Sequence, residues 1–268
     1  MSGGTALLME RVVGRRVVQG VEEIGFAGAL FAESIYWMLF GRTRQQPVRL
    51  QAILVQAVQI GLQSLPIATL LSATIGIMLA IQSLYTLGLF GAQSFATVGI
   101  ALSVVREFAP LIIGILIAGR TGSSLAARFS TMMINQEVDA LRVIGISPVR
   151  YLVAPALFAM MVMVPCLTMW ANIVALAAAG MIVTPSLDIS MLAYATNVME
   201  SISTNDLWHG LAKSALFAAL VAIVSSLNGA LAQGGAEGVG RMTTRAVVQS
   251  IAAIVIADMI FAYAATLS

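Results

Sequence analysis

The sequence contains very few charged residues. Only 10% of its 268 residues are charged and 59% are hydrophobic, whereas soluble domains carry about 25% charged residues. No charge occurs between Arg49 and Arg106, a stretch of 56 residues, although a membrane-spanning helix needs only about 20. This shortage excludes an ordinary soluble domain and predicts a protein that crosses a membrane several times.

The residues that usually perform chemistry are also scarce. The single cysteine, Cys166, excludes an intrachain disulfide, and with one histidine it cannot build a zinc site or a catalytic set. The segment "AGRTGSS" lacks the Gly-Lys-Ser/Thr ending of a phosphate-binding loop, and no strand precedes "GGAEGVG". We therefore predict no catalytic residue, metal, cofactor or ATPase site. A net charge of +2 on scattered basic residues gives no reason to expect nucleic acid.

Long apolar segments dominate what remains. We predict membrane-spanning helices near residues 64–88, 97–124, 152–183, 207–233 and 246–267. Residues 7–24 have an amphipathic helical pattern, and an aromatic run follows. This is typical of a helix lying in the membrane interface, and a helix docked on the bundle has the same pattern. The prediction is an all-α membrane protein of one domain, with an interfacial helix and elbow (1–47) and a transmembrane bundle (48–268).

Arginines predict the orientation of the bundle. Arg42, Arg44 and Arg49 form a basic elbow before the first span, and the loops after the second and fourth spans also contain arginines. The loops after the first and third spans contain no basic residue. The positive-inside rule therefore places the N-terminus in the cytoplasm and the C-terminus outside. Three aromatic residues are predicted near the outer boundary: Tyr85, Tyr194 and Trp208.

The connections and packing faces also have recognisable patterns. The segment between the third and fourth spans reads as a polar loop with a short helix, and "GGAEGVGRMTTR" reads as a glycine-rich loop. Small residues recur every four positions, which predicts closely packed helices. They are Ser72, Gly76 and Ala80; Ala171, Ala175 and Ala179; and Ala215 and Ala219.

A charged segment separates the second and third spans. Residues 130–146 are predicted as a helix on which Ile134, Val138 and Leu141 share an apolar stripe beside charged residues. Gly145 and Pro148 would end it. Such a helix suits the groove of a partner protein, and a solvated interfacial helix remains the alternative.

The same region carries a family resemblance. The residues concerned are Arg106, Glu107, Pro110, Ala118 to Arg120, Gly122, Ser123, Asp139 to Leu141, Gly145, Pro148, Tyr151 and Leu152. In this pattern the sequence resembles the permease family typified by MlaE and YrbE proteins, and "GVGRMTTRAVVQS" with Asp258 is similar to the family's C-terminal pattern. The chain differs from the family at Arg128, where Glu is common, and in the order Gln136-Glu137.

The resemblance implies a role. These permeases are the membrane subunits of ATP-binding-cassette (ABC) transporters that move phospholipid or another hydrophobic lipid. It implies a homodimer in the bacterial inner membrane, two ATPase subunits, a periplasmic MCE-domain protein and a STAS-domain accessory protein. Residues 130–146 would be the cytoplasmic coupling helix that docks onto the ATPase. Its expected contacts are Met133, Glu137, Asp139, Leu141 and Arg142.

Charged residues within the spans have two interpretations. Arg106 and Glu107 could line the lipid cavity or hold its gate, or they could form structural ion pairs with neighbouring spans. Asp258 is expected to bond a neighbouring span, with a relay of protons or cations as the alternative. Lys213 is expected to extend outward to the interface, and His209 to be an interfacial residue.

Two other functions compete with the ATP-driven permease. One is an ion-coupled secondary transporter with Glu107, Asp258 and His209 as a relay, although the internal repeats typical of such carriers are missing. The other is a membrane scaffold, which would not explain charges buried at Arg106 and Glu107.

Overall fold

The chain is helical throughout the part that the structure describes. This computed structural model describes the backbone of residues 3–41 and 50–267, with side chains for residues 18, 20–41 and 50–264. These residues form α-helices with short 3-10 and π-helical turns, and no strand occurs among them. Five helical rods are long and apolar enough to cross a membrane, which confirms the predicted all-α membrane fold.

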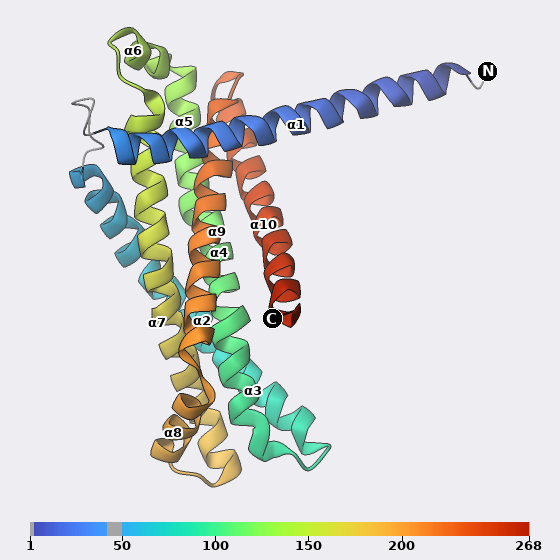
Figure 1. The fold of residues 1–268 in the computed structure, drawn as a ribbon, viewed down its shortest axis with the longest axis vertical. Coiled ribbons are helices and arrows are strands. Elements are labelled where there is room, and N and C mark those ends of the chain that lie inside the picture. Colours follow the sequence, from blue (N-terminus) through green and yellow to red (C-terminus); the bar gives the residue numbers. More distant parts are fainter. Residues whose placement is uncertain (1–2, 42–49, 268) are drawn as a thin grey trace.

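The five rods, called spans one to five below, pack lengthwise into a bundle (Figure 1). They are α2 (Leu50–Gly88), the composite rod Gln93–Ile134, the rod Val149–Leu187, α9 (Thr204–Ala230) and α10 (Gly235–Leu267). Span two consists of η1 (Gln93–Phe95), α3 (Ala96–Ser103), η2 (Val104–Phe108), α4 (Ala109–Ile117), η3 (Ala118–Gly122) and α5 (Ser123–Ile134). Span three consists of η4 (Val149–Val153) and α7 (Ala154–Leu187).

Two spans begin earlier than predicted. The helix of span one starts at Leu50 rather than near Ser64, and Pro66 lies within it. The glycine-rich loop predicted before span five is wrong, because α10 already starts at Gly235. The positive φ angles of this turn occur at Gly234 (+90°) and Gly235 (+71°), and glycine adopts such angles easily. The residues after them continue as helix.

Helix α1 (Gly3–Phe40) lies crosswise over one end of the bundle (Figure 1). Leu30 and Ser34 are buried, and α1 packs against α9, η4 and α7. Val21 and Ile24 are exposed, Ile24 to 74%. The helix therefore docks onto the bundle, as one interpretation of its sequence expects, and its exposed apolar residues are compatible with the membrane-interface interpretation. The predicted basic elbow lies in residues 42–49, outside the described residues.

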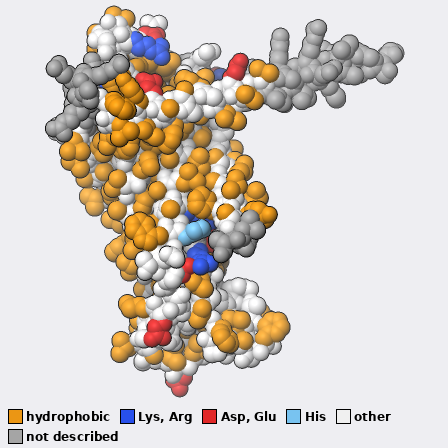
Figure 2. Space-filling model, viewed as in Figure 1, with side chains coloured by type: hydrophobic (Ala, Val, Ile, Leu, Met, Phe, Trp, Pro, Cys, Tyr) orange, Lys and Arg blue, Asp and Glu red, His pale blue; other side chains and the backbone are white. Residues whose placement is uncertain are grey.

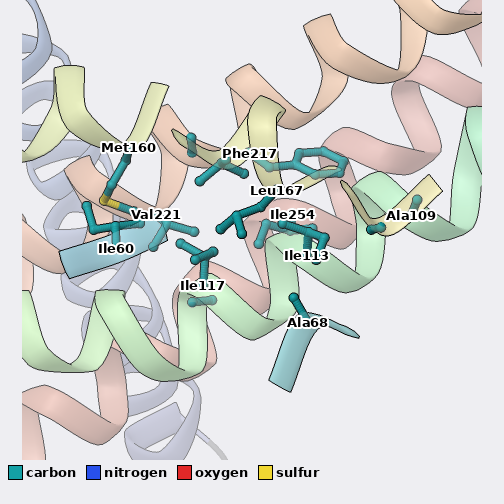
Figure 3. Packing of buried hydrophobic residues seen from close by; sticks show 14 of the residues in the cluster. Ile60, Ala68, Ala109, Ile113, Ile117, Met160, Leu167, Phe217, Val221 and Ile254 are labelled. Carbon is teal, nitrogen blue, oxygen red and sulfur yellow. The ribbon is translucent and has the colours of Figure 1, made fainter. Parts of the chain in front are cut away.

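The core forms where spans one to five meet (Figure 3). Ile113 and Ile117 of span two belong to one hydrophobic cluster with Phe217 and Val221 of span four and Ile254 of span five. All five side chains are buried. Figure 3 shows these side chains converging from different helices. Spans three and four are the most enclosed, whereas only 28% and 17% of the apolar windows of spans one and five are buried.

The small-residue faces of spans one and three pack closely against each other. A Cβ atom at Gly76 in span one would overlap the backbone carbonyl of Ala175 in span three. Ser72 and Ala80 are buried on the same face of α2, and Ala171 and Ala179 on that of α7. The close approach of the two helices therefore requires the absence of a side chain at Gly76.

Of the three aromatic residues predicted near the outer boundary, one is buried rather than at the surface. Tyr194 lies in α8 (Met191–Ser201), the short helix predicted between spans three and four, and it is only 2% exposed. Its hydroxyl donates a hydrogen bond of 3.0 Å to the backbone carbonyl of Leu176. Burial raises the pKa of Tyr194 to about 12. Tyr194 therefore fixes α8 to span three, while Tyr85 and Trp208 are each 68% exposed.

Candidate functional site

An ion pair links spans two and four. The guanidinium of Arg106 donates to Asp206, with Nε 2.5 Å from Oδ1. Asp206 also accepts hydrogen bonds from the backbone N–H and the hydroxyl of Ser203. Its own backbone N–H donates to Ser203 Oγ at 3.3 Å, which completes the capping box of α9. The Asp206 carboxylate thus caps the N-terminus of α9, where a negative charge is favourable. The same carboxylate also pairs with Arg106. Half of the Arg106 side chain stays exposed.

A second network joins spans two, four and five. The Lys213 ammonium lies 2.5 Å from Glu107 Oε2 and 2.7 Å from Asp258 Oδ1. It also donates to the backbone carbonyl of Arg106 at 3.4 Å. The Lys213 side chain is 0% exposed. The prediction that Lys213 extends outward is therefore wrong, since two carboxylates hold it inside the bundle.

The backbone geometry explains how Lys213 reaches its partners. Arg106 and Glu107 lie in η2, a π-helical turn, and such turns occur frequently at functional sites. One turn before Lys213 is Gly210, where a Cβ atom would overlap the backbone carbonyl of Val105. Span four therefore approaches span two closely at the level where the lysine is needed.

Each charged residue predicted within the spans thus meets a partner on a neighbouring span, whereas Arg106 and Glu107 do not pair with each other. Arg106 and Glu107 point to different partners, as expected for adjacent helix positions, and Asp258 makes the predicted bond to a neighbouring span. Sequence reasoning missed Asp206 and Lys213. The signal was present, because a lysine inside an apolar span is expected to pair with an intramembrane carboxylate, and the second and fifth spans each supplied one.

The histidine lies beside this network. His209 packs edge-to-face against Phe261 of span five, with ring centroids 5.6 Å apart. It is half-buried, and its Nδ1 has no hydrogen-bond partner among the described residues. Figure 2 shows the histidine beside charged side chains partway along the bundle, with hydrophobic side chains on one side of this group.

The depth of the network follows from the length of span two. Arg106 and Arg120 are separated by 14 helical positions, or about 21 Å along the rod, and the residues between Glu107 and Arg120 are uncharged. This distance is shorter than the thickness of a bilayer core, which is about 30 Å. Arg106, with the Lys213 network, marks one level, and Arg120 marks the other, nearer α1.

The charged segment after span two differs from the prediction. Residues 130–146 do not form one helix, since α5 ends at Ile134 and α6 covers only Glu137–Val143. The break occurs at Gln136, whose φ is +60°, and Gly145 with φ +78° follows α6. The continuous stripe expected from Ile134 to Leu141 is therefore interrupted by a left-handed residue.

Exposure separates two sets of side chains in this segment. Val138 is buried, and Met133 packs partly buried against the core. Val143 and Ile144 are 88% and 67% exposed. Their exposure was not predicted. The predicted apolar stripe ended at Leu141, which is half-buried, and did not include them.

The charged residues of the segment are at its surface. Arg142 and Asp139 form an exposed ion pair of 3.2 Å within α6, and Glu137 accepts a hydrogen bond of 3.2 Å from Asn135. Exposed ion pairs contribute only about 0–1 kcal/mol. These three charged side chains can therefore exchange their local contacts for a partner's at little cost.

Helix α1 is attached to the end of the same segment. Glu33 accepts hydrogen bonds from Ser147 Oγ at 2.9 Å and from Trp37 Nε1 at 3.0 Å. The Arg150 guanidinium lies 5.6 Å from the centroid of the Trp37 ring, within cation–π distance. The connection between α6 and span three is thus held against α1.

Comparison with known proteins matches the sequence to a family. The sequence matches the family described as Permease MlaE over residues 53–264. It is 32% identical over 246 residues to a probable ABC transporter permease protein of Rickettsia felis, covering 92% of this chain and 93% of the relative.

Two further relatives come from photosynthetic organisms. A probable ABC transporter permease protein of Synechocystis is 33% identical over 205 residues, which cover 76% of this chain and 78% of the relative. The chloroplastic protein TRIGALACTOSYLDIACYLGLYCEROL 1 of Arabidopsis thaliana is 32% identical over 200 residues, which cover 75% of this chain and 57% of the relative.

Five apolar spans, ionic contacts between them and a charged segment beyond span two define an all-helical, multi-pass membrane permease. The chain belongs to the MlaE permease family, which confirms the resemblance seen in its sequence.

Proposed function

We propose that this chain is the permease subunit of an ATP-driven lipid transporter, powered by separate ATPase subunits. The observation that carries the proposal is the exposed tip of α6, where Val143 and Ile144 stand uncovered beside Asp139 and Arg142. An apolar pair flanked by charges suits a protein groove. The relatives named as ABC transporter permeases support an ATPase as the owner of that groove.

Coupling requires that the docked segment be mechanically attached to the bundle. We assign the polar contacts with the ATPase to Glu137, Asp139 and Arg142, and the apolar contacts to Val143 and Ile144. Met133 and Leu141, expected from sequence as apolar contacts, are partly buried, so their role is to seat α6 on the permease. Movement of α6 would then pass directly to α5 and span three.

The lipid path is proposed to form between two copies of the chain. Spans one and five bury the smallest share of their apolar windows, so they are the surfaces available to lipid or to a second copy. Arg106 has half of its side chain exposed while Asp206 holds it, which leaves part of its guanidinium for a lipid headgroup at the cavity or gate. Glu107 is held there by Lys213. The Arabidopsis relative is named for trigalactosyldiacylglycerol, a lipid.

The proposal extends to the orientation of the bundle and to its remaining partners. Arginines gather at the α1 end of the bundle, so the positive-inside rule supports a cytoplasmic N-terminus and a periplasmic C-terminus in a bacterial inner membrane. An MCE-domain protein would then exchange lipid at the α8 end. Two ATPase subunits, and a STAS-domain accessory protein, would bind at the α6 end.

The test is co-purification of the ATPase from native membranes. The double variant Val143→Asp with Ile144→Asp should lose the ATPase while the permease still inserts, because charge enters the proposed apolar contact. The matched control is Leu192→Asp in α8, where Leu192 is 78% exposed at the other end of the bundle. Equal ATPase recovery from the double variant and the control would refute the docking assignment.

Energy coupling can be tested separately. Collapse of the proton gradient at constant ATP should leave transport intact. Abolished transport under this condition would instead favour the ion-coupled carrier, in which Glu107, Asp258 and His209 form a relay.

A further inference from the structure

Two arginines, Arg120 and Arg128, lie away from the Lys213 network, in the half of span two nearest α1. Arg120 donates to Ser64 Oγ at 2.7 Å and to Gln63 Oε1 at 3.0 Å, and both acceptors are neutral. In the described part of the chain it forms no ion pair with a carboxylate. Its hydrogen bonds orient the guanidinium without neutralising its charge.

Arg128 lies two helical turns further along the same rod. The side chain is exposed, and neither an ion pair nor a hydrogen bond holds it among the described residues. It borders a small hollow of about 90 Å³ between spans one and two, whose other polar lining residues are Gln56, Gln59, Thr121 and Ser124. Each of these four side chains can donate a hydrogen bond.

The hollow has the electrostatics of an anion site. No carboxylate lines it, so no lining residue compensates the positive charge of Arg128 there. Amide and hydroxyl donors surround a guanidinium there, which is the combination that binds phosphate oxygens well. The hollow is too small for acyl chains but open to the outside of the bundle, where lipid would lie.

Its depth also fits a lipid headgroup. Arg128 is six positions before the end of α5 at Ile134, or about 9 Å along the helix. Arg120 is a further eight positions, about 12 Å, toward the bilayer centre. The two charges therefore run from the level of the membrane surface near α1 into the apolar region, on the opposite half of the bundle from Arg106.

We propose that Arg128, with Gln56, Gln59 and Ser124, binds the phosphate group of a phospholipid in the leaflet on the α1 side. Arg120 is the next positive charge along the route into the bundle. The assignment of this ligand as a transported lipid rests on the proposed function. The site itself is defined by its hollow and by arginines that pair with no carboxylate among the described residues. Arg128 lies about 33 Å along the rod from Arg106.

The experiment measures lipid retained by the full-length permease without its partners. The protein is held in dodecyl maltoside micelles, which carry no phosphate, doped with a minor fraction of phosphatidylglycerol, or of diacylglycerol, which has no phosphate either. Native mass spectrometry then counts retained lipids. Wild type should retain phosphatidylglycerol over diacylglycerol, and Arg128→Gln should lower phosphatidylglycerol retention about tenfold, as expected for loss of one charged hydrogen bond.

Controls separate the site from general basic charge. Arg128→Lys should retain part of the binding because it keeps the charge, and Gln59→Leu should weaken binding without changing any charge. Arg241→Gln removes an exposed arginine of α10 that does not line the hollow, so it should bind like wild type. Equal losses in Arg128→Gln and Arg241→Gln, or no loss in Arg128→Gln, would overturn the proposal.

Two further arms identify the ligand's source. Inorganic phosphate added in excess should not displace the retained lipid; Arg128-dependent displacement would show that the site takes free phosphate and would overturn the lipid assignment. ATPase co-purification with Arg128→Gln should remain normal. Because lipid retention is read without the ATPase, failure of this site and failure of the ATP-driven transport proposal give different results.

Discussion

Replacement of Lys213 by methionine should strongly destabilise the bundle, because the lysine is the cation at the centre of the buried network. Its ammonium lies 2.5 Å from Glu107 and 2.7 Å from Asp258 and is fully buried. At an effective dielectric constant of about 20, each contact is worth about 6 kcal/mol before desolvation. Desolvation offsets much of this, at several kcal/mol per ion.

The net effect follows from what is left behind. Lys213→Met removes the cation that two carboxylates share, and breaking a buried ion pair in this way costs about 3–5 kcal/mol. We therefore expect the free energy of unfolding to fall by that amount. The triple variant Lys213→Met, Glu107→Gln and Asp258→Asn should recover at least half of the loss, because no unpaired charge remains.

The assay is unfolding of the full-length permease in mixed micelles by titration with dodecyl sulfate, followed by far-ultraviolet circular dichroism. Leu216→Met, on the lipid-exposed side of the same helix, should stay within about 0.5 kcal/mol of wild type. The reasoning is refuted if Lys213→Met is as stable as this control, or if the triple variant is less stable than the single one.

Three other changes test separate contacts. Gly76→Leu should prevent close packing of α2 on α7, because even a Cβ atom overlaps the carbonyl of Ala175; monodisperse protein on size-exclusion chromatography would contradict this. Val143→Asp alone should weaken ATPase binding about tenfold by placing a charge in an apolar contact, measured by surface plasmon resonance on the purified subunits, whereas unchanged affinity would argue for another docking surface. Glu33→Ala removes the acceptor of Ser147 and Trp37, so amide hydrogen exchange at residues 145–150 should rise while exchange in α9 stays constant; equal rates in both proteins would show that α1 does not restrain the segment.

Several features follow directly from local sequence. Uncharged runs longer than a bilayer core require spanning helices, so the number and order of the spans were predictable. Small residues at four-residue spacing marked faces of α2 and α7 for close packing, because a glycine or alanine stripe permits close approach, although the pattern did not say which helices would meet.

Other features depended on local backbone choices that composition does not specify. A glycine-rich segment reads as a loop, yet two positive φ angles at Gly234 and Gly235 complete the turn and the rest becomes α10. The charged segment reads as one helix, yet Gln136 adopts a left-handed conformation and divides it. Because both outcomes depend on single residues at the ends of helices, periodicity alone does not reveal them.

The sequence by itself determined that the chain is a helical membrane protein, which charges lie within its spans and which family it belongs to, since these depend on composition and local pattern. Only the tertiary structure decided which charges meet. Arg106 and Glu107 are neighbours in sequence, but one contacts Asp206 and the other Lys213, about 100 residues away. The partner of a buried charge is set by how the spans pack around Gly210, and that packing is a property of the whole bundle rather than of any one helix.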